Sequence, residues 1–181
     1  MDSNKLNKIL EENEILKKEN ELLKETLKNL KISLEFDKLT EVYNKKTFEE
    51  LVNKYNDKGI LVIIDINNFK SINDTYGHLK GDEILNQLGA TLNKIVRKSD
   101  FVGRFGGDEF LIFFKEIDLE KANNIMNRLN DNISKIKIDN NYYLSTSYGL
   151  TQYNNNISYN DNFKIADKYL YENKRNLKNI D

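Results

Sequence analysis

The hydrophobic positions of this chain follow two patterns, and the change between them comes near residue 36. From Lys5 to about Phe36 there is neither glycine nor proline, and the apolar residues fall on one heptad register. The apolar members of the register are Leu6, Leu27 and Leu34 at position a, and Ile9, Leu16, Leu23 and Leu30 at position d. Asn13 and Asn20 occupy the remaining a positions, where paired amides favour a two-stranded assembly. The pattern predicts a parallel, dimeric coiled-coil helix over residues 1–36.

The charged residues beside this stripe agree with parallel pairing. Glu12 and Glu19 fall at position g, and Lys17 and Lys24 fall five residues later at position e, where they oppose the glutamates in a parallel dimer. The other interpretation is an amphipathic helix that packs on the chain's own domain. A helix of about 45 to 50 Å, at 1.5 Å per residue, is too long to lie on so small a domain along its whole length. The pattern therefore favours the coiled coil.

Beyond this segment, helical and extended patterns alternate. Amphipathic helices are expected at 45–55, 84–96, 119–136 and 163–176, and strands at 60–66, 101–104, 109–114 and 142–151. The glycine-bearing segment 105–108 joins two strands as a hairpin, and the asparagine-rich segment 153–161 is expected to be a mobile loop. A hairpin within such alternation predicts an α+β domain over residues 37–181, with a mixed, largely antiparallel sheet covered by helices.

Composition limits the class of protein. With 181 residues, of which 39% are hydrophobic, the chain can hold one full-sized domain and one appended element. The absence of cysteine excludes disulfides, thiolate metal sites and a cysteine nucleophile. A net charge of -1 argues against a nucleic-acid-coating surface, and no apolar run approaches the roughly 20 residues of a membrane helix. We expect a cytoplasmic protein that binds neither nucleic acid nor membrane.

Three carboxylates occupy positions where chemistry is expected. Asp65 ends the apolar strand 60–66, where an unpaired carboxylate would be costly to bury, and Asp108 and Glu109 lie at the hairpin turn. If the hairpin lies beside that strand, the three groups converge as Mg²⁺ with a nucleotide phosphate requires. The alternative is that Asp65 caps a helix starting near Asn67 and that the other two are ordinary turn residues. Spacing alone does not decide between these interpretations.

Four motifs resemble one known family. Residues 104–110 read R-F-G-G-D-E-F, and residues 65–82 match D-x-D/N-x-F-K-x-x-N-D-x-x-G-H-x-x-G-D. Upstream, Asp37, Leu39, Thr40 and Asn44 match D-x-L-T-x-x-x-N, and near the end Ala166, Asp167, Leu170, Tyr171 and Lys174 match A-D-x-x-L-Y-x-x-K. Over residues 37–179 the chain therefore resembles the GGDEF family of diguanylate cyclases, which implies a palm-like nucleotide-cyclase fold.

The resemblance implies a reaction and its partners. Each domain would bind one GTP, and two facing domains of a homodimer would join them into cyclic di-GMP with release of pyrophosphate. It implies two Mg²⁺ ions per active site, with Mn²⁺ as a substitute, held by Asp65, the carbonyl of Ile66, Asp108 and Glu109. Glu109, Asp108 and Lys70 would be the catalytic residues, with Lys70 contacting phosphate; a helix-surface lysine is the alternative for Lys70.

The resemblance also implies the substrate contacts. Asn73 and Asp82 would read the guanine edge, because a carboxylate accepts from donors that adenine lacks. Their alternatives are a helix-end asparagine and the N-cap of a helix beginning near Glu83. The remaining substrate-binding positions are Phe69 at the pocket wall, Gly106 and Gly107 in the turn, and Lys174 and Lys178 at the phosphates. The lone His78 falls at a structural position rather than a catalytic one.

A further match is Arg97 with Asp100, an R-x-x-D pattern five residues before the GGDEF turn. In the family this pattern binds cyclic di-GMP and inhibits the enzyme. The alternative is a cation near a helix C-terminus followed by a turn aspartate. The chain also departs from the family pattern, at Glu41, Lys45, Lys46, Leu177 and Lys178. Lysine in place of arginine keeps the charge but loses the bidentate geometry.

Two other functions compete with catalysis. A non-catalytic receptor would keep the nucleotide site or the R-x-x-D site and signal by binding. Retention of six active-site positions argues against it; these are Asp65, Lys70, Asn73, Asp82, Asp108 and Glu109. A purely structural coiled-coil adaptor would explain the N-terminal helix but leaves the carboxylates without a role.

Overall fold

The computed structural model describes residues 3–55 and 57–178, with side chains for residues 7–55 and 57–175. The chain divides into two compact units, residues 1–35 and 36–181. The first unit consists of helix α1 (Ser3–Glu35). None of the helices within the described residues combines the length and the apolar character needed to cross a bilayer.

Helix α1 is present where the heptad pattern predicts it, and its apolar stripe is exposed. Ile9, Leu16, Leu23, Leu27 and Leu30 are between 40% and 57% exposed. The amides at the two polar a positions donate to the helix's own carbonyls four residues back, each at 2.9 Å. The Leu6 side chain lies outside the described residues. Dimerisation through this stripe stays a prediction.

The second unit has an α+β fold, as predicted. Its elements are β1 (Tyr43–Asn44), α2 (Lys45–Tyr55), β2 (Gly59–Ile66), α3 (Phe69–Tyr76), α4 (His78–Ile95), β3 (Phe101–Arg104), β4 (Glu109–Lys115), α5 (Leu119–Ile133), β5 (Lys137–Asp139), β6 (Tyr142–Tyr143), β7 (Thr146–Gln152) and α6 (Tyr159–Lys178). The main sheet has the order β1-β3-β4-β2-β7. Only β1 and β3 pair in parallel within it, so the sheet is mixed and largely antiparallel.

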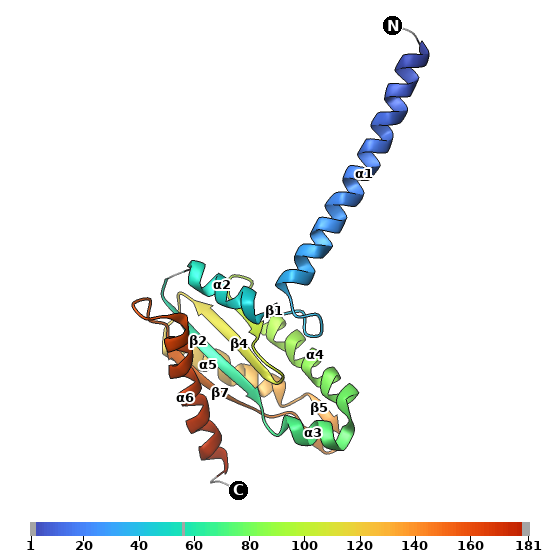
Figure 1. Ribbon diagram of the computed structural model, residues 1–181. Coiled ribbons are helices and arrows are strands. Elements are labelled where there is room, and N and C mark those ends of the chain that lie inside the picture. Colours follow the sequence, from blue (N-terminus) through green and yellow to red (C-terminus); the bar gives the residue numbers. More distant parts are fainter. Residues whose placement is uncertain (1–2, 56, 179–181) are drawn as a thin grey trace. The chain divides into compact units, whose positions relative to one another are not determined.

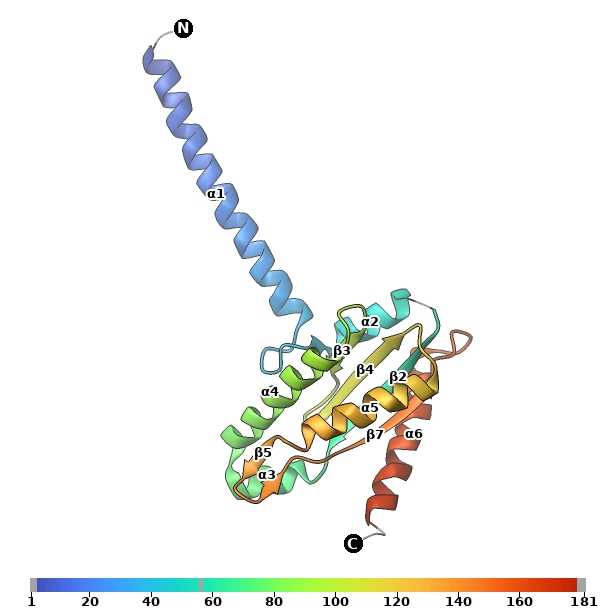
Figure 2. The same cartoon turned by 180° about the vertical axis from the view of Figure 1, so that it is seen from behind.

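Central strand β2 is buried on both faces, because helices cover both sides of the sheet (Figures 1 and 2). Successive side chains of a strand point to opposite faces. Accordingly Ile60, Val62 and Ile64 join one core cluster with residues of α3, α4 and α5. Leu61 and Ile63 join the other, with residues of α2 and α6. This double burial explains the continuous apolar run in the sequence.

Several boundaries differ from the sequence prediction. Helix α4 begins at His78 rather than at residue 84, so Asp82 lies inside it, and the N-cap position belongs to Gly77 with φ 84°. Helix α5 ends at Ile133, and α6 begins at Tyr159. Helix α3 was expected only in the alternative that places a helix start near Asn67. The predicted strand 142–151 divides into β6 and β7, and its partner β5 was not predicted.

The predicted asparagine-rich loop is shorter than expected and is tied to α6. Asn162 is fully buried, and its side chain accepts from the backbone N–H of Asn154 at 2.8 Å. The same side chain donates to the carbonyls of Asn154 and Ser158. One buried amide thus satisfies the backbone of both ends of the loop.

Candidate active site

The candidate site lies where β2 ends beside the GGDEF turn. Asp65 and Glu109 are directly paired positions of β2 and β4. The backbone N–H of Ile66 donates to the carbonyl of Asp108 at 3.2 Å, which joins the end of β2 to the turn. The antiparallel register therefore places the strand carboxylate and the turn carboxylates side by side, as expected if the hairpin lies next to this strand.

Asp65 is 8% exposed and forms an ion pair with α6. Its Oδ1 lies 2.7 Å from Nζ of Lys174. Burial raises the pKa of Asp65 and outweighs the lowering that the lysine causes. On the other side, β7 places the fully buried Ser147 opposite Asp65. Asp65 is thus held in a partly desolvated position, and among the described side chains Lys174 is its ion-pair partner.

Glu109 has three acidic neighbours. Burial is the largest cause of the raised pKa of Glu109. The neighbouring Asp65, Asp108 and Asp167 raise this pKa further, while Lys174 lowers it. Lys164 and Lys168 also line the pocket beside Glu109. The acidic groups favour the approach of a cation.

The carboxylates at this site suit Mg²⁺ that is bound partly by substrate phosphates better than a metal ion that is bound by protein ligands alone. Among the described residues, no three acidic, histidine or cysteine side chains are gathered closely enough to hold a metal by themselves. Mg²⁺ is usually bound through one or two carboxylates together with waters and substrate phosphates. Asp65 and Glu109 can supply these two carboxylates, and the backbone at Ile66 lies beside them. The protein part of the site is therefore suited to a metal that arrives with a nucleotide.

Asn67 holds the loop after β2 in place through partners that the sequence analysis did not predict. Asn67 accepts from Ser147 Oγ at 2.7 Å and donates to Ser145 Oγ at 3.2 Å. Asn68 adopts a left-handed conformation with φ 57°, which turns the chain into α3. Lys70 then lies exposed in the first turn of α3. Asn67 matched its motif, yet only the fold could reveal its partners on β7.

The candidate guanine residues come together where α3 meets α4. The Oδ1 atom of Asn73 is buried without a hydrogen-bond partner in the described structure. Gly81 allows α4 to approach this amide, because a Cβ there would lie 1.9 Å from that Oδ1. Asp82 follows in α4 and is exposed. Phe69 is 9% exposed and packs in the core, so it forms the wall of this region.

The GGDEF turn is held by Arg104, to which the sequence analysis assigned no role. Gly106 and Gly107 precede β4, and their carbonyls accept from Nε and Nη2 of Arg104 at 3.1 and 2.7 Å. Gly107 is exposed, and a Cβ there would meet nothing within 4 Å. The open face leaves room for a bulky ligand near the backbone.

Two of the three lysines predicted to contact phosphate lie on α6, and the third, Lys70, lies on α3. Lys174 faces Asp65 and lines a pocket of about 300 Å³ with Glu109, Asp167 and Tyr171. Lys178 is the last residue of α6, and its side chain lies outside the described residues. One of the two predicted lysines on α6 is therefore placed at the carboxylate pair.

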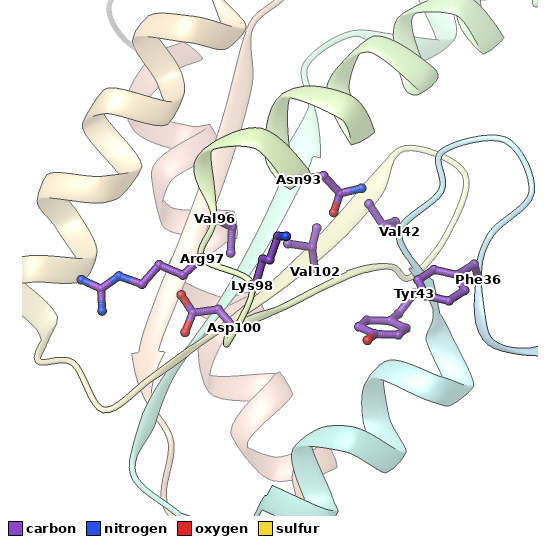
Figure 3. A pocket seen from close by; sticks show the side chains of 9 residues that line it. All are labelled: Phe36, Val42, Tyr43, Asn93, Val96, Arg97, Lys98, Asp100 and Val102. Atoms are coloured by element: carbon purple, nitrogen blue, oxygen red, sulfur yellow. The ribbon is translucent and has the colours of Figure 1, made fainter. Parts of the chain in front are cut away.

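Arg97 and Asp100 line a separate pocket of about 390 Å³ (Figure 3). Both lie in the turn between α4 and β3. Asp100 is 9% exposed and accepts from the backbone N–H of Lys115 at 3.0 Å, whereas Arg97 is exposed and extends away from the aromatic rings of Phe36 and Tyr43. These two rings are stacked, with centroids 4.8 Å apart. The turn thus presents a charged rim beside an aromatic and aliphatic wall.

Replacing Glu109 with glutamine is expected to stabilise the metal-free protein above mildly acidic pH. The pKa of Glu109 is raised in the folded state, so the ionised side chain costs stability once the pH exceeds that raised pKa. The cost disappears below the unfolded pKa near 4.5. In EDTA at pH 7.5, Glu109→Gln should raise Tm by about 2 °C. Near pH 4 it should leave Tm unchanged, as should the exposed control Glu50→Gln at both pH values; an equal shift of Glu109→Gln at both pH values would contradict the assignment.

Comparison with known proteins identifies the family. The family model described as "Diguanylate cyclase, GGDEF domain" matches residues 34–180. Protein YhcK of Bacillus subtilis is 36% identical over 80% of this chain and 44% of its own length. Diguanylate cyclase DosC of Escherichia coli is 34% identical over 79% of this chain and 34% of its own length. The chain thus spans less than half the length of either relative.

A solved structure shares the fold. The coiled coil and GGDEF domain of DgcB from Caulobacter crescentus, crystallised in complex with cyclic di-GMP, matches with a TM-score of 0.84 and 22% identity. The match covers 93% of this chain and 95% of that chain. The family match extends over both the acidic turn and the strand that faces it. The chain belongs to the GGDEF-domain family of diguanylate cyclases.

Proposed function

We propose that the protein is a diguanylate cyclase, in which two copies each bind one GTP and join them into cyclic di-GMP. Each 3′-hydroxyl would attack the α-phosphate of the other nucleotide, and two pyrophosphates would leave. The observation that carries this proposal is the Asp65–Glu109 pair beside an open glycine turn, with Lys174 as its cation. An acidic pair of this kind suits metal-assisted nucleotidyl transfer.

Asp65, the carbonyl of Ile66, Asp108 and Glu109 would hold two Mg²⁺ ions, and Mn²⁺ could replace them. When bound, these ions supply positive charge that offsets the triphosphate and the carboxylates. Lys174 and Lys70 are assigned to the phosphates, and Lys178 is assigned to the same task by its motif position. Because Lys174 pairs with Asp65 in the described structure, phosphate binding would exchange one anionic partner of this lysine for another.

Selection of guanine is assigned to Asn73 and Asp82. The buried, unpartnered Oδ1 of Asn73 supports this assignment, because a buried polar atom without a partner is costly unless something binds near it. Asp82 is exposed on the neighbouring helix and can accept from the N1–H and N2–H groups of guanine. Adenine lacks those donors, so we infer a preference for GTP over ATP.

The second copy is assigned to a coiled-coil dimer through α1. Exposed apolar side chains at the a and d positions support this pairing, since their burial against a second helix would be favourable. Joining two domains in this way raises the effective concentration of the second GTP site. A single domain holds only half of the reactants.

Incubation of the purified protein with GTP and Mg²⁺ tests the proposal. We expect cyclic di-GMP and pyrophosphate in a ratio of one to two, with no cyclic product from ATP. If no product forms, isothermal titration with GTP shows whether the protein still binds the nucleotide. GTP binding without turnover would favour a receptor, and the absence of both would overturn the nucleotide assignment.

Product inhibition is assigned to Arg97 and Asp100. A guanidinium can fork onto guanine or phosphate, and a carboxylate can accept from the base. Their position on the rim of a pocket with two stacked aromatic rings supports binding of a nucleotide there. DgcB, which shares the fold, was crystallised with cyclic di-GMP.

Arg97→Ala is expected to raise the plateau of product formation. The change removes the exposed guanidinium but leaves Asp100 and its bond to Lys115 in place. Added cyclic di-GMP should then inhibit at least about tenfold more weakly, which corresponds to loss of a charge-assisted pair. Lys94→Ala, at an exposed residue one helical turn earlier, is the control. Unchanged inhibition of Arg97→Ala would remove Arg97 from the product site.

A further inference from the structure

One arginine joins the catalytic turn to a second turn that is distant in the sequence. Arg104 directs two of its nitrogens at the carbonyls of Gly106 and Gly107, at 3.1 and 2.7 Å. Its third nitrogen, Nη1, lies 3.1 Å from Oδ1 of Asp37. The Arg104 side chain is only 16% exposed. A planar guanidinium can make all three contacts at once, because its donors lie in a fixed fork.

Other contacts also hold the GGDEF turn, because the carbonyl of Asp108 accepts from the backbone N–H of Ile66 at 3.2 Å and Phe105 stacks on Phe163 with centroids 4.5 Å apart. The backbone N–H groups of Phe105 and Gly106 both point at the carbonyl of Glu109, at 2.8 and 3.4 Å. No side chain packs where a Cβ of Gly107 would lie. Arg104 therefore orients the carbonyls of the two glycines, and Glu109 follows Gly107 by two positions in the chain. The fork therefore acts on the residues that lead into β4, the strand that begins at Glu109.

The other end of the contact is a rigid turn. Oδ1 of Asp37 also accepts from Thr40, from the backbone N–H at 2.9 Å and the hydroxyl at 2.6 Å. Burial raises the pKa of Asp37, but the bonds from Thr40 and Arg104 outweigh it and lower the pKa overall. Asp37 therefore stays ionised and fixes the arginine that faces it.

Helix α4 packs closely against the turn that contains Asp37 and Thr40. Nδ2 of Asn86 donates to the carbonyl of Leu39 at 2.8 Å. Gly89 lets the helix approach so closely that a Cβ there would lie 2.5 Å from the carbonyl of Thr40. The turn is thus fixed on the helix that also carries Asp82. In sequence, Asp37 follows the last residue of α1 by two positions.

We propose that Arg104 is a positioning residue for the catalytic turn, and that Asp37 makes the geometry of that turn depend on the segment that follows α1. The inference rests on the proposed cyclase function. Arg104 touches neither the candidate metal ligands nor the candidate guanine residues through any described side-chain contact. It acts on the reaction through the carbonyls of Gly106 and Gly107, and Asp37 acts through Arg104.

Steady-state kinetics of Arg104→Lys tests the first part. Lysine keeps the positive charge but cannot bond to three separated oxygens. We expect kcat to fall by roughly 10- to 100-fold, since a displacement of about 1 Å at the reacting groups has that effect. KM for GTP should change by less than about threefold, because the guanine contacts lie on α3 and α4. Arg128→Lys, the same change at an exposed site on α5, should alter neither constant.

A double-mutant cycle tests the second part. Asp37→Asn keeps the shape of the side chain and removes its charge. Alone it should lower kcat by a few-fold, and in the Arg104→Lys background it should have no further effect. Additive effects would show that Asp37 acts independently of the arginine. An unchanged kcat in Arg104→Lys would overturn the positioning role.

Hydrogen exchange separates failure of this inference from failure of the cyclase proposal. Exchange at the amides of Phe105 and Gly106 should become at least about tenfold faster in Arg104→Lys, while exchange in β2 stays unchanged. This readout does not require turnover. If the wild type forms no cyclic di-GMP but the exchange changes as expected, the cyclase proposal is wrong, while the positioning of the turn by Arg104 is confirmed. Unchanged exchange at these amides would contradict the positioning role of Arg104, whether or not the protein forms cyclic di-GMP.

Discussion

Glu109→Gln is expected to reduce formation of cyclic di-GMP by roughly 100- to 1,000-fold or more, because it removes one of two directly paired carboxylates at the proposed site of nucleotidyl transfer. The amide has nearly the same shape, so the hairpin should keep its register. GTP binding should persist, since Asn73 and Asp82 lie on α3 and α4. Measurement of kcat and of GTP affinity by titration checks both expectations.

The matched control for this change is Glu50→Gln on α2, whose side chain is 65% exposed and pairs with Lys46. It should leave kcat unchanged. If Glu109→Gln retained more than about a tenth of the wild-type kcat, the carboxylate of Glu109 would have no essential role in catalysis.

Leu23→Glu is expected to abolish cyclisation at low protein concentration while leaving GTP binding intact. Leu23 occupies a d position, where a buried glutamate opposite its own copy would prevent pairing. Activity should return as the protein concentration is raised, because the domains can then meet without the helix. Leu23→Pro should behave in the same way, since proline inside a helix costs about 3 kcal/mol or more.

Ile32→Glu provides a matched control on the same helix. Ile32 is 47% exposed and falls at position f, which faces away from the partner in the predicted dimer. The change is the same in chemistry but should preserve both the dimer and the activity at low concentration. Sedimentation and activity measured at the same concentrations check the pair of variants. Undiminished activity of Leu23→Glu would show that the domains pair without help from α1.

Elements with long or continuous patterns could be predicted from the sequence. The heptad stripe fits α1, and the apolar run of β2 reflects burial on both faces of the sheet. The hairpin of β3 and β4 could be predicted because Gly106 and Gly107 mark its turn between two apolar strands. In these elements, local chemistry and tertiary packing require the same residues.

Other features depend on contacts between distant segments. Helix α3 has only a short apolar face, so its stability depends on the packing of Phe69 and Ile72 in the core. The bond between Asn67 and Ser147 joins residues 80 positions apart, and that between Arg104 and Asp37 joins residues 67 apart. No local pattern encodes such pairs. The motifs identified the carboxylates of the candidate site, whereas the side chains that position them required the fold.

The central claim, that two copies complete one reaction, is tested most directly by mixing wild-type protein with Glu109→Gln at constant total concentration and allowing subunits to exchange. Cyclic di-GMP formation should fall with the square of the wild-type fraction, because a product with two new bonds needs two competent copies in one dimer. A linear fall, with each wild-type copy retaining its full rate, would contradict the claim.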